Sequence, residues 1–171
     1  MQSSIDRVPN DDELYALAVW AGVALAGRGH RLVLAESCTG GWVAQCITDV
    51  AGSSGWFERG YVAYSNDSKC QLLAVPAEIL ERHGAVSEPT VAAMAAGALR
   101  ASGADCAVAV SGIAGPGGGT EEKPVGTVCF AWTWRDGGSV VQTRRLEGDR
   151  RGVRRQAVAI ALGGLLELYG E

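Results

Sequence analysis

Short apolar runs alternate along this chain with longer segments of helical character, and this alternation limits the folds that the chain can adopt. The runs at 32–35 and 106–110 are too short for helices, and the second is apolar throughout, which is typical of a strand buried on both faces of a sheet. Helical spacing or helix-start signals occur at about 14–25, 39–50, 76–83, 87–102 and from 149 onward. The alternation predicts an α/β fold.

The last third of the chain predicts that the sheet is mixed. Residues 128–133 and 140–146 are rich in strand formers and flank a turn at Asp136, Gly137 and Gly138, so we expect a β-hairpin. A hairpin requires antiparallel pairing, whereas strands joined through helices run parallel. Together these elements predict a three-layer α/β/α sandwich with a mixed β-sheet, formed as a single domain by residues 11–171. Residues 1–10 have few apolar side chains and are expected to form a loose leader.

Composition narrows the class of protein. A chain of 171 residues suffices for one domain that buries roughly 70% of its unfolded surface. The net charge of −4 gives no electrostatic reason to bind nucleic acid, and no apolar run approaches the ~20 residues needed to span a bilayer. We therefore expect no nucleic-acid or membrane partner and a cytoplasmic location. The five cysteines are odd in number and show no CxxC spacing, which argues against disulfides and a zinc site.

The stretch AESCTGGW, residues 35–42, places Ser37 between a short apolar strand and the start of a helix. A hydroxyl group at such a junction can act as a nucleophile. The first N–H groups of a helix lack intrahelical partners, so those of Thr39, Gly40 and Gly41 are candidates for binding a developing oxyanion. Considered alone, Ser37 also fits a helix N-cap, which stabilises a helix by ~1 kcal/mol.

Lys69 is the candidate base. Residues 61–65 predict a strand bounded by Gly60 and Asn66, after which Asn66 or Asp67 can cap a short helix with Lys69 in its first turn. An ordinary lysine pKa near 10.4 leaves about one neutral amine in a thousand near pH 7.4. Burial can lower the pKa of a lysine by up to roughly 3–5 units, and the positive end of a helix further disfavours an ammonium. Considered alone, Lys69 also fits a solvated surface charge.

Three segments, AESCTGGW, VAYSNDSK and SGIAGPGGGTEEKPVGTV, resemble in order and spacing the CinA C-terminal domain family, and the similarity covers nearly the whole chain. Stand-alone members of this family are nicotinamide mononucleotide deamidases. The resemblance implies a single-domain hydrolase that converts nicotinamide mononucleotide to nicotinic acid mononucleotide and ammonia, in pyridine nucleotide salvage and without a metal or other cofactor. In the family, the residues that match Ser37 and Lys69 are the nucleophile and its base. The resemblance also suggests a homodimer.

The glycine-rich loop resembles the family's substrate-binding segment, which implies nucleotide contacts from Ser111, Gly112, Ile113, Ala114 and Gly115. By itself the loop would indicate only a flexible surface segment, because its spacing matches neither a Rossmann nor a Walker A motif. The Ser111 hydroxyl could orient either Lys69 or the substrate amide. Tyr64 and Asn66 are candidates for the same crevice, with a structural role at a strand end as the alternative.

The substrate phosphate needs positive partners, and arginines cluster at positions 144–155. Most of them are expected to be surface charges, and Arg145 and Lys123 are weak candidates for the phosphate ligand. Cys38 is an alternative nucleophile, but a single thiol without a histidine partner is more often a buried apolar residue, so we favour Ser37. Two other functions stay open: a catalytically silent nucleotide-binding or regulatory module, and a Ser/Lys hydrolase of another amide or ester.

Overall fold

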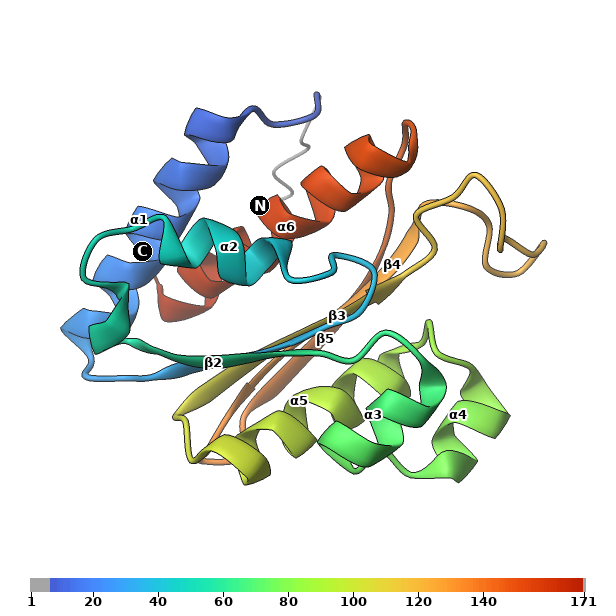
Figure 1. Ribbon diagram of the computed structural model, residues 1–171, viewed down its shortest axis with the longest axis horizontal. Coiled ribbons are helices and arrows are strands. Elements are labelled where there is room, and N and C mark those ends of the chain that lie inside the picture. The colour runs from blue at the N-terminus through green and yellow to red at the C-terminus, as the bar shows by residue number, and fades with distance from the viewer. Residues whose placement is uncertain (1–6, 171) are drawn as a thin grey trace.

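The structure is a computed structural model that describes residues 7–170. Within these residues the chain alternates between helices and the strands of one sheet, as Figure 1 shows. The elements in chain order are α1 (Asp11–Gly27), β1 (Leu32–Glu36), α2 (Trp42–Thr48), the short 3-10 helix η1 (Ser53–Gly55), β2 (Phe57–Val62), α3 (Asn66–Leu73), α4 (Ala77–His83), α5 (Glu88–Ser102), β3 (Cys106–Gly112), β4 (Thr127–Trp134), β5 (Ser139–Arg145) and α6 (Arg150–Tyr169).

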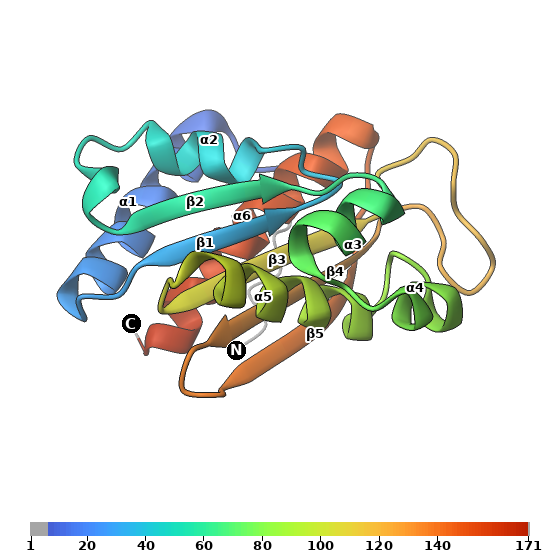
Figure 2. The ribbon, with the colours of Figure 1, turned by 60° about the horizontal axis from the view of Figure 1, so that its bottom comes forward.

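The sheet has the strand order β2-β1-β3-β4-β5 and is mixed (Figure 2). Strand β1 pairs in parallel with both β2 and β3, whereas β4 pairs antiparallel with β3 and with β5. The pair β4 and β5 forms the expected hairpin. Because β1, β2 and β3 run in the same direction, their carboxyl ends lie at one edge of the sheet.

Helices cover both faces of the sheet, with α1, α2 and α6 on one face and α3, α4 and α5 on the other (Figure 1). Successive residues of β1 alternate between the two cores: Leu32 and Leu34 pack beneath the first group of helices, and Val33 and Ala35 pack against the second. All four side chains are buried, as are those of the central strand β3 up to Ser111. The predicted three-layer α/β/α sandwich with a mixed sheet is confirmed.

Two element boundaries differ from the sequence prediction. Helix α2 starts at Trp42 rather than near Thr39, because Gly40 and Gly41 adopt positive φ angles of 61° and 93° that no right-handed helix contains. Strand β2 covers Phe57–Val62 rather than 61–65, and it pairs along the whole of β1. As a result Ser65, and not Asn66 or Asp67, is the N-cap of α3, and Lys69 is the fourth residue of that helix.

The N-terminal segment is attached to the domain within the part that the structure describes. Residues 1–6 of the expected leader lie outside the described residues. Asn10 forms a capping box with Glu13 at the start of α1, and the buried Pro9 accepts a hydrogen bond from Arg155 through its carbonyl oxygen. None of the helices within residues 7–170 has the length and apolar character that a membrane span needs.

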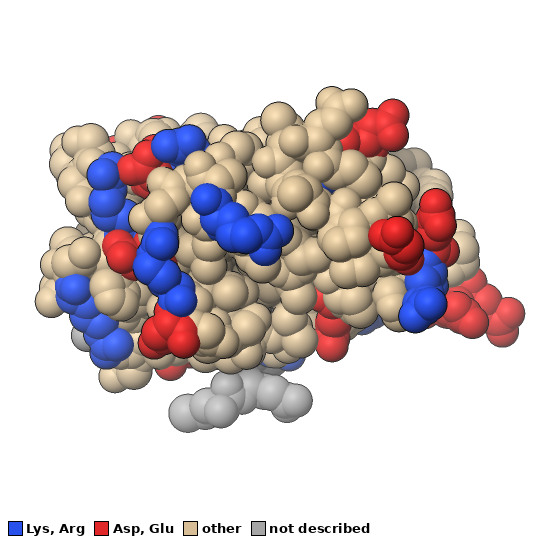
Figure 3. Space-filling model, turned by 90° about the horizontal axis from the view of Figure 1, so that it is seen from below, with Lys and Arg blue, Asp and Glu red and all other residues tan. Residues whose placement is uncertain are grey.

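The face formed by α3, α4 and α5 carries charges of both signs. Figure 3 shows acidic and basic side chains interspersed there, with uncharged surface between them. This face therefore presents no continuous basic band, in agreement with the net charge of −4. The candidate site lies instead at the edge of the sheet where β1, β2 and β3 end.

Candidate active site

The parallel strands β1, β2 and β3 deliver the predicted site residues to a single crevice. Ser37 directly follows β1, Ser111 is the penultimate residue of β3, and β2 leads through Ala63 and Tyr64 into the helix that carries Lys69. The crevice outside the carboxyl ends of such strands is the usual ligand site of open α/β sheets. The topology thus explains how residues that are far apart in the sequence meet.

Ser37 and Lys69 are in direct contact. The Nζ atom of Lys69 lies 3.0 Å from the Oγ atom of Ser37. The Ser37 backbone is anchored to the neighbouring strand β3, because its N–H group donates to the carbonyl oxygen of Val110. Both residues are buried, with 7% of Ser37 and 1% of Lys69 exposed. This contact has the geometry expected of a nucleophile and its general base.

Three oxygen atoms surround Lys69 Nζ, an arrangement that accommodates both the ammonium form and the neutral amine. Its Nζ atom also lies 3.0 Å from the carbonyl oxygens of Ala63 and of Tyr64. A neutral amine has two hydrogens and one lone pair, so the two carbonyls can take the hydrogens while the lone pair faces the Ser37 hydroxyl. Burial lowers the pKa of Lys69 below its ordinary value, because the apolar surroundings disfavour the ammonium form.

Cys38 is a poor candidate for the nucleophile. Burial raises the pKa of its thiol to about 12, so near neutral pH the group is an uncharged thiol rather than the reactive thiolate. For the same reason it supplies no negative charge that could restore the ammonium form of Lys69. Its sulfur packs against the backbone of the glycine-rich loop, and a Cβ atom on Gly112 would lie 3.1 Å from it. The preference for Ser37 over Cys38 therefore has a physical basis.

The turn after Ser37 differs in one respect from the arrangement expected of an oxyanion site. The Gly41 N–H donates to the carboxylate of Glu36 at 3.0 Å, and the Gly40 N–H donates to the carbonyl of Ser37 at 3.0 Å. Neither amide is free in this structure, so the oxyanion assignment of Gly40 and Gly41 needs correction. Thr39 is fully buried, and its Oγ1 has no hydrogen-bond partner among the described residues.

The glycine-rich loop forms one wall of the crevice. Ser111, Gly112 and Ala114 line a cavity of about 160 Å³ together with Ser37 and Lys69. The Ser111 hydroxyl donates to the carbonyl of Ala85 at 2.7 Å, so its lone pairs remain available to a ligand. Two further residues of the segment stabilise this wall through backbone hydrogen bonds. The Ile113 N–H donates to the Thr127 carbonyl, and the Gly115 carbonyl accepts from the Arg150 guanidinium.

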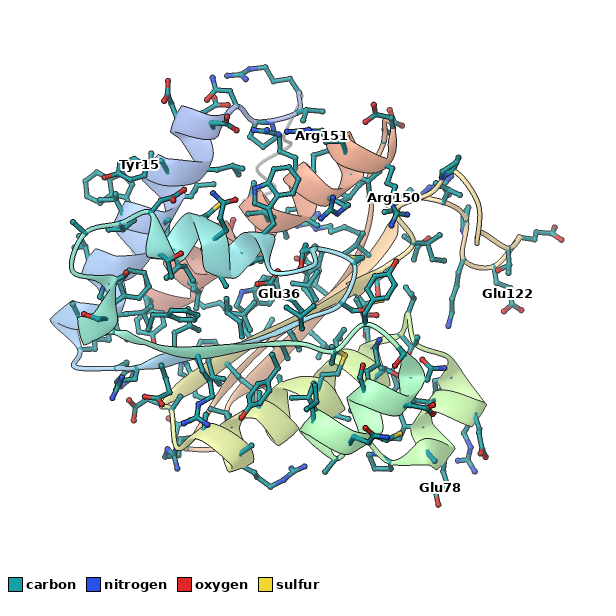
Figure 4. The ribbon with its side chains drawn as sticks, in the orientation of Figure 1. Tyr15, Glu36, Glu78, Glu122, Arg150 and Arg151 are labelled. Atoms are coloured by element: carbon teal, nitrogen blue, oxygen red, sulfur yellow. The ribbon has the colours of Figure 1, made fainter. Side chains whose placement is uncertain are left out.

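A larger cavity of about 1000 Å³ adjoins the small one, and Ala114 and Arg150 line both. Its walls carry the indole of Trp42 and four arginines from the start of α6, at positions 150, 151, 154 and 155. The Arg150 guanidinium donates to the Gly115 carbonyl at 2.8 Å and to the Tyr64 hydroxyl at 3.4 Å. Figure 4 shows Arg150 at the start of α6, beside the base of the glycine-rich loop.

The remaining predicted residues lie apart from these two cavities, with Tyr64 as the exception. Tyr64 lines the small cavity, whereas Asn66 is an exposed first residue of α3. Lys123 donates to the carbonyl of His83, and Arg145 is exposed at the end of the edge strand β5. Neither Lys123 nor Arg145 lines either cavity. Their proposed contact with phosphate stays an untested prediction.

Comparison with known proteins identifies the family of the chain. Residues 15–169 match the family model of the CinA C-terminal domain. The chain belongs to the CinA C-terminal domain family.

Two relatives of similar length match this chain over nearly their whole length. Nicotinamide-nucleotide amidohydrolase PncC of Escherichia coli strain K12 is 56% identical over 159 residues, which cover 93% of this chain and 96% of that protein. The protein of the same name from Enterobacter agglomerans is 52% identical over 153 residues, with 90% of this chain and 93% of that protein covered. The crystal structure of the competence/damage inducible protein CihA from Agrobacterium tumefaciens is 43% identical with a TM-score of 0.88, covering 94% and 96% of the two chains.

Sequence reasoning missed two polar residues of the site, Glu36 and Arg154. Glu36 ends the apolar strand β1 and is 1% exposed, and Arg154 donates to the turn that follows Ser37. An acidic residue directly after an apolar run was the available signal for Glu36, because a buried carboxylate needs hydrogen-bond partners. For Arg154 the sequence indicated only a cluster of arginines at positions 144–155, without distinguishing among them.

Proposed function

We propose that this chain hydrolyses the carboxamide of nicotinamide mononucleotide, giving nicotinic acid mononucleotide and ammonia, by means of a Ser37 and Lys69 dyad. The observation that carries the proposal is the buried contact of 3.0 Å between Lys69 Nζ and Ser37 Oγ. Relatives more than half identical to this chain are named nicotinamide-nucleotide amidohydrolases, which supports the substrate. Such a reaction belongs to the salvage of pyridine nucleotides.

The reaction has two stages. The Ser37 oxygen attacks the carboxamide carbon while its proton passes to the lone pair of Lys69. The carbon–nitrogen bond then breaks, the Lys69 ammonium returns the proton to the departing nitrogen, and ammonia leaves an ester on Ser37. In the second stage Lys69 takes a proton from water and the resulting hydroxide attacks the ester carbon; the bond from this carbon to the Ser37 oxygen then breaks, Lys69 returns the proton to that oxygen, and the carboxylic acid leaves. Each proton taken by Lys69 is given back, so the enzyme ends unchanged.

The two adjoining cavities fit the two parts of this substrate. The small cavity of about 160 Å³ has room for a pyridine ring with its carboxamide, and it contains both members of the dyad. The free lone pairs of Ser111 can accept a hydrogen bond from the carboxamide nitrogen. The phosphoribosyl group would then extend past Arg150 into the larger cavity lined by arginines. We assign the phosphate contact to Arg150, because it alone among these arginines lines both cavities.

Replacement of the nucleophile tests the proposal. Ser37→Ala should abolish ammonia release in a coupled assay while the circular dichroism spectrum and melting temperature change little. Activity on nicotinamide mononucleotide should exceed activity on nicotinamide riboside and on nicotinamide, because only the nucleotide has a phosphate. Full activity in Ser37→Ala would exclude the dyad. Binding of the nucleotide by the unaltered chain without any ammonia release would instead favour the silent binding module.

A further inference from the structure

Glu36 forms a buried capping interaction with the helix that follows Ser37. One oxygen of its carboxylate accepts hydrogen bonds from the N–H groups of Gly41 and Val43, at 3.0 and 3.1 Å, and the other accepts from Ala44 at 2.9 Å. Figure 4 shows Glu36 beneath the start of α2, inside the molecule. The N-cap position of α2 is Gly41, which has no side chain, so Glu36 provides the acceptors that an N-cap residue usually provides.

Arg154 holds the same turn from the opposite side. Its Nε atom donates to the carbonyl of Cys38 at 2.9 Å, and its Nη2 atom donates to the carbonyl of Thr39 at 3.1 Å. The guanidinium also lies over the ring of Trp42, 5.4 Å from its centroid. A planar guanidinium with fixed donors suits two consecutive carbonyls better than a flexible ammonium does.

These contacts determine where the amides after the nucleophile point. In a trans peptide the N–H is directed opposite to the carbonyl of the preceding residue. The Cys38 carbonyl faces Arg154, so the Thr39 N–H points away from that arginine. Likewise the Ser37 carbonyl accepts from Gly40, so the Cys38 N–H points away from Gly40.

Neither of these two amides donates to a protein group within residues 7–170, although Cys38 is 6% exposed and Thr39 is fully buried. Buried N–H groups without an acceptor are rare in folded proteins, and they call for an explanation such as a ligand. Two unpaired donors directly after a nucleophilic serine are candidates for binding an oxyanion, and Cys38 lines the small cavity beside Ser37.

We propose that Glu36 and Arg154 are positioning residues that together orient this turn, so that the N–H groups of Cys38 and Thr39 bind the oxyanion formed on the substrate carbonyl. The inference rests on the proposed acyl transfer to Ser37. Glu36 occupies the amides of α2 that would otherwise compete for the oxyanion, and Arg154 fixes the peptide plane between Cys38 and Thr39. Glu36 lines neither cavity and Arg154 lines only the larger one, so neither side chain reaches the small cavity that contains the dyad.

The test replaces one carboxylate oxygen with a donor. Glu36→Gln keeps the size of the side chain but brings an NH2 group against backbone N–H groups, so part of the capping interaction is lost and the turn moves. We expect kcat at saturating nicotinamide mononucleotide to fall about 100-fold, the loss typical of one misplaced oxyanion donor, with KM changed less than about threefold. The matched control is Asp105→Asn. Asp105 accepts a backbone hydrogen bond from Arg31 just before the opposite end of β1, and its replacement should leave kcat unchanged.

Variants of Arg154 provide a second test, which does not depend on whether the Glu36 variant folds. Arg154→Lys, which can still donate to a carbonyl, should retain more of kcat than Arg154→Met. If Arg154→Met and Glu36→Gln are both folded and keep kcat within about threefold, the inference is wrong. An unfolded Glu36 variant leaves the decision to the two Arg154 variants. Ser37→Ala separates the two proposals: if it is inactive while these variants keep kcat, only the positioning role fails.

Discussion

Replacement of Lys69 by arginine isolates the property on which the proposed chemistry depends, namely an amine that can lose its proton. Arginine keeps a long cationic side chain, but its guanidinium stays protonated at every accessible pH and cannot act as a base. In the structure, Lys69 Nζ lies 3.0 Å from Ser37 Oγ and from two carbonyl oxygens, so in the neutral form its lone pair can face the Ser37 hydroxyl while the carbonyls accept its two hydrogens. Lys69→Arg therefore places a permanent positive charge beside Ser37 and removes proton transfer.

The expected loss follows from the protonation state. A lysine with an ordinary pKa near 10.4 is neutral in about one molecule in a thousand near pH 7.4, and every unit by which burial lowers the pKa raises that fraction about tenfold. Burial lowers the pKa of Lys69, so the neutral form is enriched relative to a surface lysine. General base catalysis contributes roughly 10²–10⁴-fold to such reactions. We expect kcat of Lys69→Arg to fall by at least about 100-fold at every pH.

The assay is ammonia release measured from pH 6 to 10. Because the free amine is the active form, kcat/KM of the unaltered chain should rise with a slope of one and level off above the pKa of Lys69. The midpoint should lie below the ordinary lysine value, in accord with the lowered pKa. Lys69→Gln serves as a second variant of similar length in case arginine does not fit. A Lys69→Arg enzyme that keeps a tenth or more of the activity, with an unchanged pH profile, would refute the base role.

Three further predictions concern packing, the phosphate and metals. Gly97→Ala should lower stability by about 1–3 kcal/mol and reduce the melting temperature, because the new Cβ atom would lie 1.8 Å from the Leu73 carbonyl oxygen; Gly163→Ala, with nothing within 4 Å, is the matched control that should not destabilise. Arg150→Met should raise KM for nicotinamide mononucleotide about 10-fold or more without changing KM for nicotinamide riboside, whereas Lys123→Met should leave both unchanged. EDTA should not change the rate, and no cluster of three or more His, Cys, Asp or Glu residues that could hold a metal occurs in the described part of the chain.

The pattern of apolar residues predicted the architecture because each strand that is buried on both faces appears in the sequence as a short apolar run. Strand β3 is apolar from Cys106 to Val110, and β1 is apolar until Glu36, since both have helices packed on their two faces. Strand β2 was misplaced for the opposite reason. It is the edge strand beside β1, and its sequence, FERGYV, contains charged residues and a glycine that an edge position tolerates.

The meeting of Ser37 with Lys69 follows from topology, whereas the amides that surround Ser37 depend on a local detail. Parallel strands deliver their carboxyl ends to one edge, so two loops that are distant in the sequence converge. The sequence also suggested free amides at the start of α2. The acidic Glu36 after an apolar run signalled that its carboxylate needs hydrogen-bond partners, but it did not show that these partners are the first amides of α2.

The choice among the arginines of α6 depends on the orientation of the whole helix. Arg150 and Arg154 are four residues apart and therefore lie on one face, yet four arginines in this segment form two such pairs, and spacing alone favours neither. In the structure Arg150 binds the Gly115 carbonyl and Arg154 binds the Cys38 carbonyl, so one helix face joins the glycine-rich loop to the turn of the nucleophile. The docking of α6 against the sheet thus determines the relative positions of both walls. A change in its buried face, far from the dyad, should alter kcat through these two arginines.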